Sequence, residues 1–216
     1  MRQPKTARHR PTDCVYSPLP GAVRGANSRN RIVMKNCLLL VDIQNDYFPN
    51  GKMELAGIKN AACNARLLLR KFRKETLPLI HIQHVSLHPE ATFFLPGSYG
   101  ADINEAVAPL QEEKVVKKHY PNSFRDTDLF ETLQKNEIDT LTICGAMSHM
   151  CIDATTRAAF DLGFSCIVAE DGCATRDLLF QDKPIKADKV HASFMAALSA
   201  PYAEVISTQS ILERMG

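Results

Sequence analysis

Three residues of this chain, Asp42, Lys118 and Cys151, each lie at the end of a predicted β-strand or just after it, and their side chains can act together. A thiol becomes a nucleophile when a base removes its proton, and a nearby cation stabilises the charges that form. Residues 141–155 predict a strand, a short turn and a helix that opens around Met150. Cys151 would then lie at or near a helix N-terminus, where amides and the helix dipole lower the pKa of a thiol.

Each of these residues also has a purely structural interpretation. A free cysteine is commonly a small buried hydrophobic residue, and an acid such as Asp42 can cap the turn after its strand. Lys118 belongs to the charged stretch 114–118, and lysine is ordinarily solvated. His149 is either a turn residue or a substrate contact. The three candidates support a catalytic site only when they are taken together.

The elements that must position these residues alternate between strands and helices. Apolar runs of strand type occupy residues 37–42, 77–82, 115–118, 139–144, 164–169 and 203–206. Helices are predicted at residues 59–74, from Asp126 or Thr127 to about 135, from about 150 to Gly163, within 184–199 and at the C-terminus. This alternation predicts an α/β fold: a three-layer, doubly wound, mostly parallel six-stranded sheet in the order 3-2-1-4-5-6, flanked by helices.

That topology predicts where the site lies. Ligands of an open α/β sheet bind outside the carboxyl ends of the strands, where the strand order reverses. Here this point lies between the first and fourth strands, so Asp42 and Cys151 flank the crevice and Lys118 reaches into it. Residues 85–112 form a long irregular loop, which predicts a lid or a binding loop. Its aromatic residues favour a substrate with a ring, or simply pin the loop to the core.

Composition limits the classes of function. A chain of 216 residues with 45% hydrophobic residues predicts one domain, at residues 35–216. Residues 1–34 carry seven Lys or Arg and one acid, so their net charge is +6 and that of residues 35–216 is −4. A mildly acidic domain argues against a nucleic-acid partner, and no apolar run reaches the roughly 18 residues of a membrane span.

The N-terminal segment and the cysteines bear on location. Residues 1–34 have no apolar periodicity, so we predict that they are disordered. They are either an extension upstream of a natural start at Met34 or an Arg-rich targeting segment. We expect their removal to leave folding and activity intact. Seven cysteines without a CxxC pair, and the lack of a secretory signal, predict a cytoplasmic protein with reduced thiols.

Four segments in this order resemble the isochorismatase-like cysteine hydrolases. They are VDIQNDYF at residues 41–48, KHYPNSFRDTDL at 118–129, GAMSHMCIDAT at 145–155 and EDGCAT at 170–175. The resemblance covers nearly everything after residue 35. It implies a catalytic triad of Asp42, Lys118 and Cys151.

The resemblance also implies how the turn before the nucleophile contributes. It implies a cis peptide between Ala146 and Met147, and an oxyanion hole made by the backbone amides of Met147 and Cys151. Asp42 would take the proton of Cys151, the thiolate would attack a carbonyl carbon, and water would hydrolyse the thioester. Candidate substrate contacts are Gln44, Phe48 and His149.

The choice of reaction within the family depends on a departure from its motifs. Nicotinamidases of this family carry a metal site with an Asp-x-His pair after the second strand, where this chain has His84-Val85-Ser86. No Cys or Asp near His81, His84 and His88 completes another ligand set. We therefore predict a cofactor-free and metal-free enzyme.

The nucleophile then favours one reaction over its alternatives. Cys151, where isochorismatase proper commonly has an Asp, favours hydrolysis of an amide-like C–N bond in a small molecule. The alternatives are an isochorismatase-type vinyl-ether hydrolase and a non-catalytic oligomeric binding protein on the same fold. We further predict a homo-oligomer.

Overall fold

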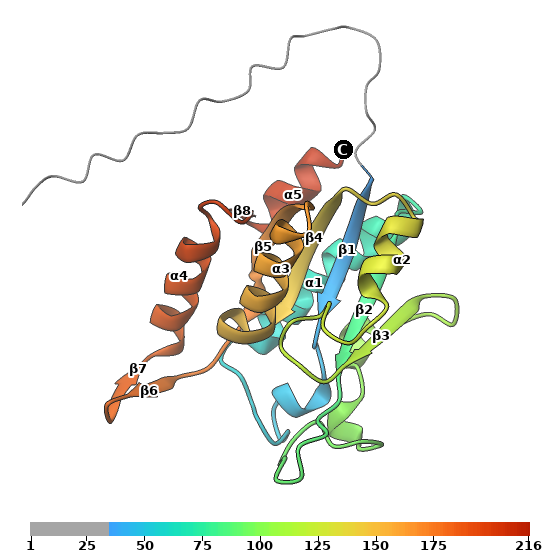
Figure 1. Cartoon of the computed structure of the whole chain (residues 1–216). Coiled ribbons are helices and arrows are strands. Elements are labelled where there is room, and N and C mark those ends of the chain that lie inside the picture. Colours follow the sequence, from blue (N-terminus) through green and yellow to red (C-terminus); the bar gives the residue numbers. More distant parts are fainter. Residues whose placement is uncertain (1–34) are drawn as a thin grey trace, which may run out of the picture. The chain divides into compact units, whose positions relative to one another are not determined.

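A computed structural model describes residues 35–216, and the prediction of disorder for residues 1–34 concerns residues outside this part. Six parallel strands form one sheet in the order β3-β2-β1-β4-β5-β8 (Figure 1). The strands are β1 (Asn36–Val41), β2 (Leu79–His84), β3 (Lys114–Lys118), β4 (Thr140–Ala146), β5 (Ser165–Ala174) and β8 (Glu204–Ile206). With β8 as the sixth strand, this is the predicted order, so the predicted fold is confirmed.

The helices lie on both faces of this sheet. They are α1 (Ile58–Lys74), α2 (Leu129–Lys135), α3 (Asp153–Asp161), α4 (Ala187–Leu198) and α5 (Thr208–Arg214). A π-helical turn, Ser148–Ile152, connects β4 to α3, and 3₁₀ turns lie at Asn45–Tyr47, Tyr99–Ala101 and Glu105–Val107. Among residues 35–216, no helix is both long enough and apolar enough to cross a membrane.

The three layers follow from the alternation of side chains along the strands. In β1, Leu38 and Leu40 pack with α1 and α5, through residues such as Phe72 and Ile211. Residues 37, 39 and 41 of the same strand point to the other face and pack with α2, α3 and α4. Both faces of β1 are therefore buried, as its continuous apolar sequence predicts.

Helix α1 buries one face, and this face accounts for its helical sequence pattern. Its buried side chains recur at helical spacing: Ile58, Ala61, Ala62, Ala65, Leu68, Leu69 and Phe72. Three basic residues, Lys71, Arg73 and Lys74, occupy its last turn, where they interact favourably with the helix dipole. The predicted helix at residues 59–74 is confirmed.

Several element boundaries differ from the prediction. Strand β2 begins at Leu79 and not at residue 77, because Pro78 has no amide hydrogen to donate to a neighbouring strand. Strand β5 runs on to Ala174 through a register shift opposite Ile143 and Gly145 in β4. Helix α2 begins only at Leu129, after the predicted caps.

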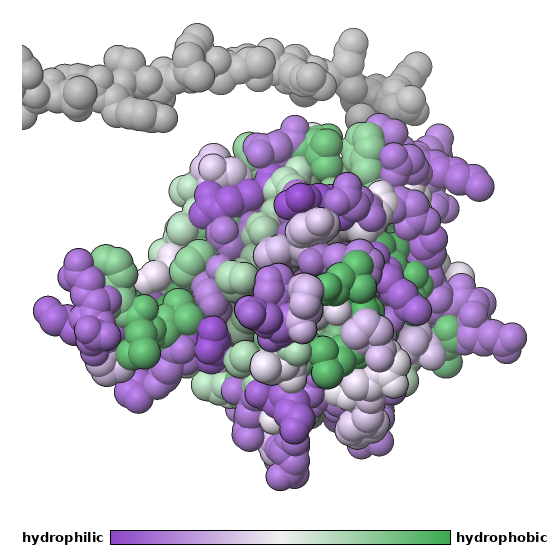
Figure 2. All heavy atoms as spheres, turned by 60° about the horizontal axis from the view of Figure 1, so that its bottom comes forward, coloured by the Kyte–Doolittle hydropathy of each residue, from purple (hydrophilic) through white to green (hydrophobic). Residues whose placement is uncertain are grey.

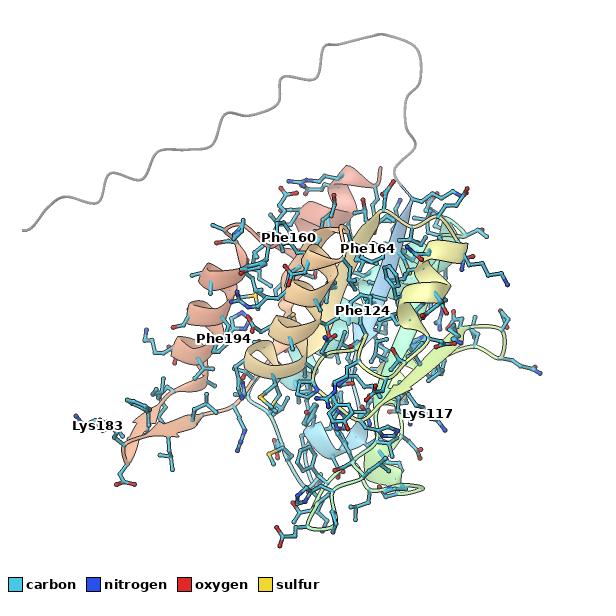
Figure 3. The ribbon with its side chains drawn as sticks, in the orientation of Figure 1. Lys117, Phe124, Phe160, Phe164, Lys183 and Phe194 are labelled. Atoms are coloured by element: carbon cyan, nitrogen blue, oxygen red, sulfur yellow. The ribbon has the colours of Figure 1, made fainter. Side chains whose placement is uncertain are left out.

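A two-stranded hairpin was missed altogether. Strands β6 (Leu178–Phe180) and β7 (Lys183–Ile185) pair through a turn at Gln181 and Asp182, both with positive φ. The sequence of this turn lacks the Asn-Gly or Asp-Gly signal of such hairpins. The hairpin projects from the body, with Lys183 near its tip (Figure 3). Figure 2 shows an apolar patch there, where Leu179 and Phe180 are 75% and 65% exposed.

Candidate active site

The carboxyl ends of β1, β3 and β4 bring the three predicted residues together. Asp42 follows β1, Lys118 is the last residue of β3, and Cys151 lies in the π-helical turn after β4. Lys118 Nζ lies 2.7 Å from Asp42 Oδ2 and 3.2 Å from Cys151 Sγ. None of the three is more than 5% exposed. They meet because parallel strands end at the same edge of the sheet.

Strand alternation explains why Lys118 is buried although lysine is ordinarily solvated. Lys117 points outward from β3 (Figure 3), so Lys118, the next residue, points to the opposite face. Besides the two groups above, its ammonium contacts His84 Nδ1 at 3.0 Å and the Tyr120 carbonyl at 3.1 Å. A buried ammonium surrounded by acceptors in this way is held in one position.

The charge of Lys118 is maintained by its neighbours. Burial lowers the pKa of this lysine, but the Asp42 carboxylate and the hydrogen bond to the Cys151 sulfur raise it above its ordinary value. Lys118 is therefore a cation at neutral pH. It balances the charge of the Asp42 carboxylate in the resting protein and can balance that of a Cys151 thiolate during a reaction.

The Cys151 thiol, in contrast, is protonated at rest. Burial raises its pKa, the Asp42 carboxylate raises it further, and the Lys118 ammonium lowers it. The prediction of a lowered pKa is wrong, because Cys151 lies in the π-helical turn and not in the first turn of an α-helix, and because loss of water outweighs the nearby cation. The thiol must pass its proton to a base during the reaction.

Asp42 is placed to be that base. Its ion pair with Lys118 is short, yet within residues 35–216 neither carboxylate oxygen has a partner at a hydrogen-bonding angle. One of these oxygens lies within 4.8 Å of the Cys151 sulfur. The carboxylate thus lies beside both the ammonium and the thiol, where it can exchange a proton with the sulfur.

The turn before the nucleophile has an unusual backbone. Gly145 has a φ of +131°, and a Cβ atom there would lie 1.9 Å from the carbonyl oxygen of Val41, so only glycine fits. The next peptide bond, Ala146–Met147, is cis, at the position that the family resemblance implies. The oxyanion role of the Met147 and Cys151 amides stays a prediction.

This turn is also tied to its neighbours. Ser148 is fully buried, and its hydroxyl lies 2.8 Å from His191 Nδ1 on α4 and 3.3 Å from the carbonyl oxygen of Ala174 in β5. The next residue, His149, bonds to the Thr175 hydroxyl at 2.6 Å. The main chain around Cys151 is therefore held from two sides.

Of the three candidate substrate contacts, Gln44 is contradicted by the structure. It is fully buried, and its amide donates to the carbonyls of His84 and Ala101 at 2.8 and 2.7 Å. Its oxygen accepts the His84 amide hydrogen at 2.8 Å. These bonds occupy the side chain, so Gln44 anchors the end of β2 and does not contact a substrate.

The other two candidates remain near the site. Phe48 is partly buried and packs against two hydrophobic clusters. His149 is partly exposed and packs edge-on against Phe194, which lies on α4 (Figure 3). Their contact with a substrate stays a prediction.

Sequence reasoning missed two residues of the site, His84 and Tyr47. His84 ends β2, which lies between β1 and β3, so its position in the sheet order places it between Asp42 and Lys118. Its position in the sequence suggests only a metal ligand, together with His81 and His88. Tyr47 is buried, and burial together with the charges of Cys151 and Asp42 raises the pKa of its hydroxyl well above the ordinary value. The sequence around Tyr47 offered no comparable signal.

The aromatic residues of the loop 85–112 prove to be partly structural. Phe94 is 1% exposed and packs edge-on against Tyr47, with ring centroids 4.7 Å apart. Its amide donates to the Asp46 carboxylate at 2.7 Å. Tyr99, in contrast, is 79% exposed. Phe94 therefore anchors the loop to Tyr47 and Asp46. A substrate with a ring stays a prediction.

A metal ion would have to compete with Lys118 in this site. Asp42, His84 and Cys151 each offer one ligand atom, all within 4.8 Å of one another. The Lys118 ammonium contacts all three groups, so it occupies the position between them. A cation placed there would meet the lysine charge at close range, so the residues do not fit a resident metal.

A second charged cluster lies at the opposite edge of the sheet, near the amino ends of the strands. Glu113 accepts hydrogen bonds from Arg73 at 2.7 and 2.8 Å, from the Leu110 amide at 2.8 Å and from His81 at 3.0 Å. A surface pocket of about 480 Å³ adjoins it, lined by Arg73 and Glu113 among others. Asp42, Lys118 and Cys151 do not line this pocket, which lies at the other end of the strands.

Comparison with known proteins agrees with this geometry. The model of the isochorismatase domain matches residues 36–210. The isochorismatase family protein YddQ of Bacillus subtilis is 49% identical over 180 residues, which cover 83% of this chain and 100% of that protein. An N-carbamoylsarcosine amidase of an Arthrobacter species is 34% identical over 79 residues, covering 37% and 30% of the two chains.

Solved structures give the same result. The crystal structure of an isochorismatase hydrolase from Oleispira antarctica matches with a TM-score of 0.80 and 49% identity. The match covers 88% of this chain and 100% of that one. Sequence and fold therefore point to one family.

Proposed function

This chain belongs to the isochorismatase family of hydrolases, and we propose that it is a cysteine-dependent, metal-independent amidohydrolase. It would cleave the C–N bond of a small molecule through a covalent thioester. The observation that carries this proposal is the Lys118 ammonium, sealed from solvent between a carboxylate and a thiol. The similarity to an amidase supports the choice of bond.

The mechanism begins with the protonated thiol. Asp42 accepts the proton of Cys151, and Lys118 stabilises the thiolate as it forms. The sulfur attacks the carbonyl carbon, and the amides of Met147 and Cys151 stabilise the oxyanion. Asp42 then gives the proton to the leaving nitrogen, the C–N bond breaks, and a thioester remains.

Water completes the cycle. Asp42 takes a proton from the attacking water, the hydroxide adds to the thioester carbon, and the C–S bond breaks. The proton returns to the Cys151 sulfur, and a carboxylic acid leaves. A single carboxylate therefore serves both half-reactions without a metal or other cofactor.

An arginine at the rim of the site bears on the class of substrate. Arg176 is exposed after β5 and forms no ion pair with any acid of residues 35–216. Its positive charge nevertheless acts on two residues of the site. Burial raises the pKa of Tyr47, and Arg176 opposes this rise. Burial lowers the pKa of His149, and Arg176 adds to this shift. We infer that the substrate carries an anionic group that pairs with this guanidinium.

The predicted homo-oligomer belongs to the same proposal. The hairpin of β6 and β7 exposes Leu179, Phe180 and Ile185, and a patch of this kind on a projecting element favours association. The cytoplasmic location stays a prediction.

The test is turnover on a panel of amides, lactams, carbamoyl compounds and isochorismate, each with and without a carboxylate. We expect an anionic amide to be hydrolysed, with turnover unchanged after prolonged chelation. Cys151→Ser should retain less than about a thousandth of the wild-type turnover, because a weaker nucleophile replaces the thiolate. The control is Cys63→Ser at an exposed thiol, which should keep full activity.

Two outcomes would contradict the proposal. If well-folded Cys151→Ser keeps about a tenth of wild-type turnover, a covalent cysteine mechanism is wrong. If isochorismate alone is turned over, the chain is a vinyl-ether hydrolase. Mass spectrometry of the quenched enzyme should detect the acyl group on Cys151.

A further inference from the structure

His84 contacts the site from the end of β2, and the mechanism above gives it no part. We propose that the two ring nitrogens of His84 have separate roles. Nδ1 positions the Lys118 ammonium, and Nε2–H donates a hydrogen bond to an acceptor oxygen of the substrate. This rests on the proposed function, because it names the chemistry that the same site recognises.

The first side of the ring faces Lys118. The Lys118 ammonium donates to His84 Nδ1 at 3.0 Å, so this nitrogen carries no hydrogen. Burial lowers the pKa of His84 to about 4, Asp42 opposes this shift, and Lys118 adds to it. The imidazole is therefore neutral at pH 7. It holds the ammonium without adding a charge to the crowded site.

This restraint matters because the ammonium has more acceptors than hydrogens. Lys118 has three N–H groups, while Asp42, Cys151, His84 and the Tyr120 carbonyl all lie within 3.2 Å. Two neutral acceptors, His84 and the Tyr120 carbonyl, hold the ammonium beside Asp42 and Cys151 without adding a charge. Its hydrogen bond to the Cys151 sulfur, at 3.2 Å, is already in place and strengthens as the thiolate forms.

The contact at Nδ1 fixes the position of the hydrogen on the other ring nitrogen, Nε2. Because Nδ1 accepts a hydrogen bond, the hydrogen of the neutral ring must be on Nε2. Within residues 35–216, Nε2 has no hydrogen-bond partner, and it is not among the polar atoms sealed away from solvent. His84 as a whole is partly exposed. A fixed and unused donor at a catalytic centre is a binding group for an acceptor.

The backbone and ring of His84 are held by other parts of the site. Gln44 bonds both the amide hydrogen and the carbonyl oxygen of His84. The ring lies 5.8 Å, between centroids, from that of Phe94 in the loop 85–112. The direction of Nε2–H is thus fixed before a substrate arrives. The substrate class is an amide with a second oxygen acceptor, a carbonyl or a carboxylate, beside the scissile carbonyl.

The experiment measures alkylation of Cys151 in the intact protein, so that it does not depend on finding a substrate. Two probes are used: iodoacetamide, which has a carbonyl acceptor, and ethyl iodide, which has none. The variants are His84→Ala, which removes both nitrogens, and His84→Asn, which keeps an acceptor near the Nδ1 position and lacks Nε2–H. His88→Asn, at an exposed histidine of the loop 85–112 that follows β2, is the matched control.

We expect His84→Ala to slow both probes about tenfold at pH 7, since a loose ammonium stabilises the thiolate less well. His84→Asn should slow iodoacetamide about tenfold but change ethyl iodide by less than about twofold. The control should match the wild type with both probes. In the hydrolysis assay, His84→Asn should raise KM only for amides that carry the second oxygen, while His84→Ala should also lower kcat.

Each part can be overturned separately. Wild-type reaction of His84→Ala with ethyl iodide would disprove the positioning role. Equal effects of His84→Asn on the two probes, or no effect on either, would disprove the Nε2–H contact. Melting curves confirm that each variant is folded. If no amide is hydrolysed, the proposed function fails, while these rates still decide the role of His84.

Discussion

Two charged clusters lie at opposite edges of the same sheet, and they are built differently. At the amino ends of the strands, Glu113 is 9% exposed at its side chain and accepts four hydrogen bonds. These bonds outweigh partial burial and lower its pKa to about 2. At the carboxyl ends, Asp42 is fully buried, and within residues 35–216 its oxygens lack a partner at a hydrogen-bonding angle.

The difference separates a structural cluster from the one that we propose to be reactive. Glu113 has all its acceptor capacity used by Arg73, His81 and the Leu110 amide, so it ties α1 and β2 to the segment before β3. Asp42 has one cation beside it, at 2.7 Å, and lies near a thiol. Satisfied carboxylates stabilise a fold, whereas unsatisfied ones are available for chemistry.

The largest effect is expected from Lys118→Ala, which breaks the reactive cluster. Turnover should fall by about a thousandfold or more, as for any member of a catalytic unit. The free energy of unfolding should fall by about 3–5 kcal/mol, because Asp42 is left as a buried charge without its partner. Cys151→Ser should lose as much activity but change stability by less than about 1 kcal/mol. Turnover and urea unfolding measure the two quantities.

The neighbouring lysine provides the control for this variant. Lys117→Ala removes an exposed lysine from the same strand and should change neither quantity. An unaltered stability of Lys118→Ala would show that Asp42 is not held as a charged group.

A smaller effect, on stability alone, is expected from Glu113→Gln. It should lower the free energy of unfolding by about 1–3 kcal/mol, because hydrogen bonds to a charged acceptor are replaced by weaker ones. Turnover should stay within about twofold of the wild type, since the cluster lies at the other edge of the sheet. Glu112→Gln, at the exposed neighbouring residue, is the control. A large loss of turnover would mean that the two clusters are coupled.

The smallest effects concern the pH dependence of stability. The two clusters should contribute to it in different pH ranges. The pKa of Glu113 is lowered to about 2 from 4.5, so its contribution is complete above pH 4.5 and is lost as the pH falls towards 2. The pKa of His84 is lowered to about 4 from 6.5. Between these values the unfolded chain binds a proton that the folded protein does not, so stability falls as the pH drops from 6.5 to 4.

Urea unfolding of the variants over this pH range checks the two windows. His84→Asn should flatten the curve only between about pH 6.5 and 4, and Glu113→Gln only below about 4.5. Identical curves for His84→Asn and the wild type would show that the imidazole is solvated in the folded protein.

Much of the site was predictable because it depends on strand ends. The apolar run before Asp42 and the one before Cys151 identified two parallel strands, and the sheet order placed both residues at one edge. Lys118 followed from its place at the end of a short strand. These inferences rest on periodicity and topology, which short stretches of sequence encode locally.

Local signals failed where the outcome depends on neighbours from distant segments. The hairpin of β6 and β7 has no turn motif in its sequence, and its projection is visible only in the structure (Figure 1). The capacity of Gln44 is used by His84 and Ala101, which lie well apart from it in the chain. Whether a side-chain amide is free to bind a ligand depends on the hydrogen-bond partners that the fold places around it, so the residue type alone does not decide its role.

The sequence by itself predicted the order of the sheet and the meeting of Asp42, Lys118 and Cys151 at its carboxyl edge. Only the tertiary structure decided their protonation. Burial raises the pKa of the Cys151 thiol even though Lys118 lies 3.2 Å from it. The balance of desolvation and charge depends on how tightly distant segments exclude water, which no spacing of residues along the chain records.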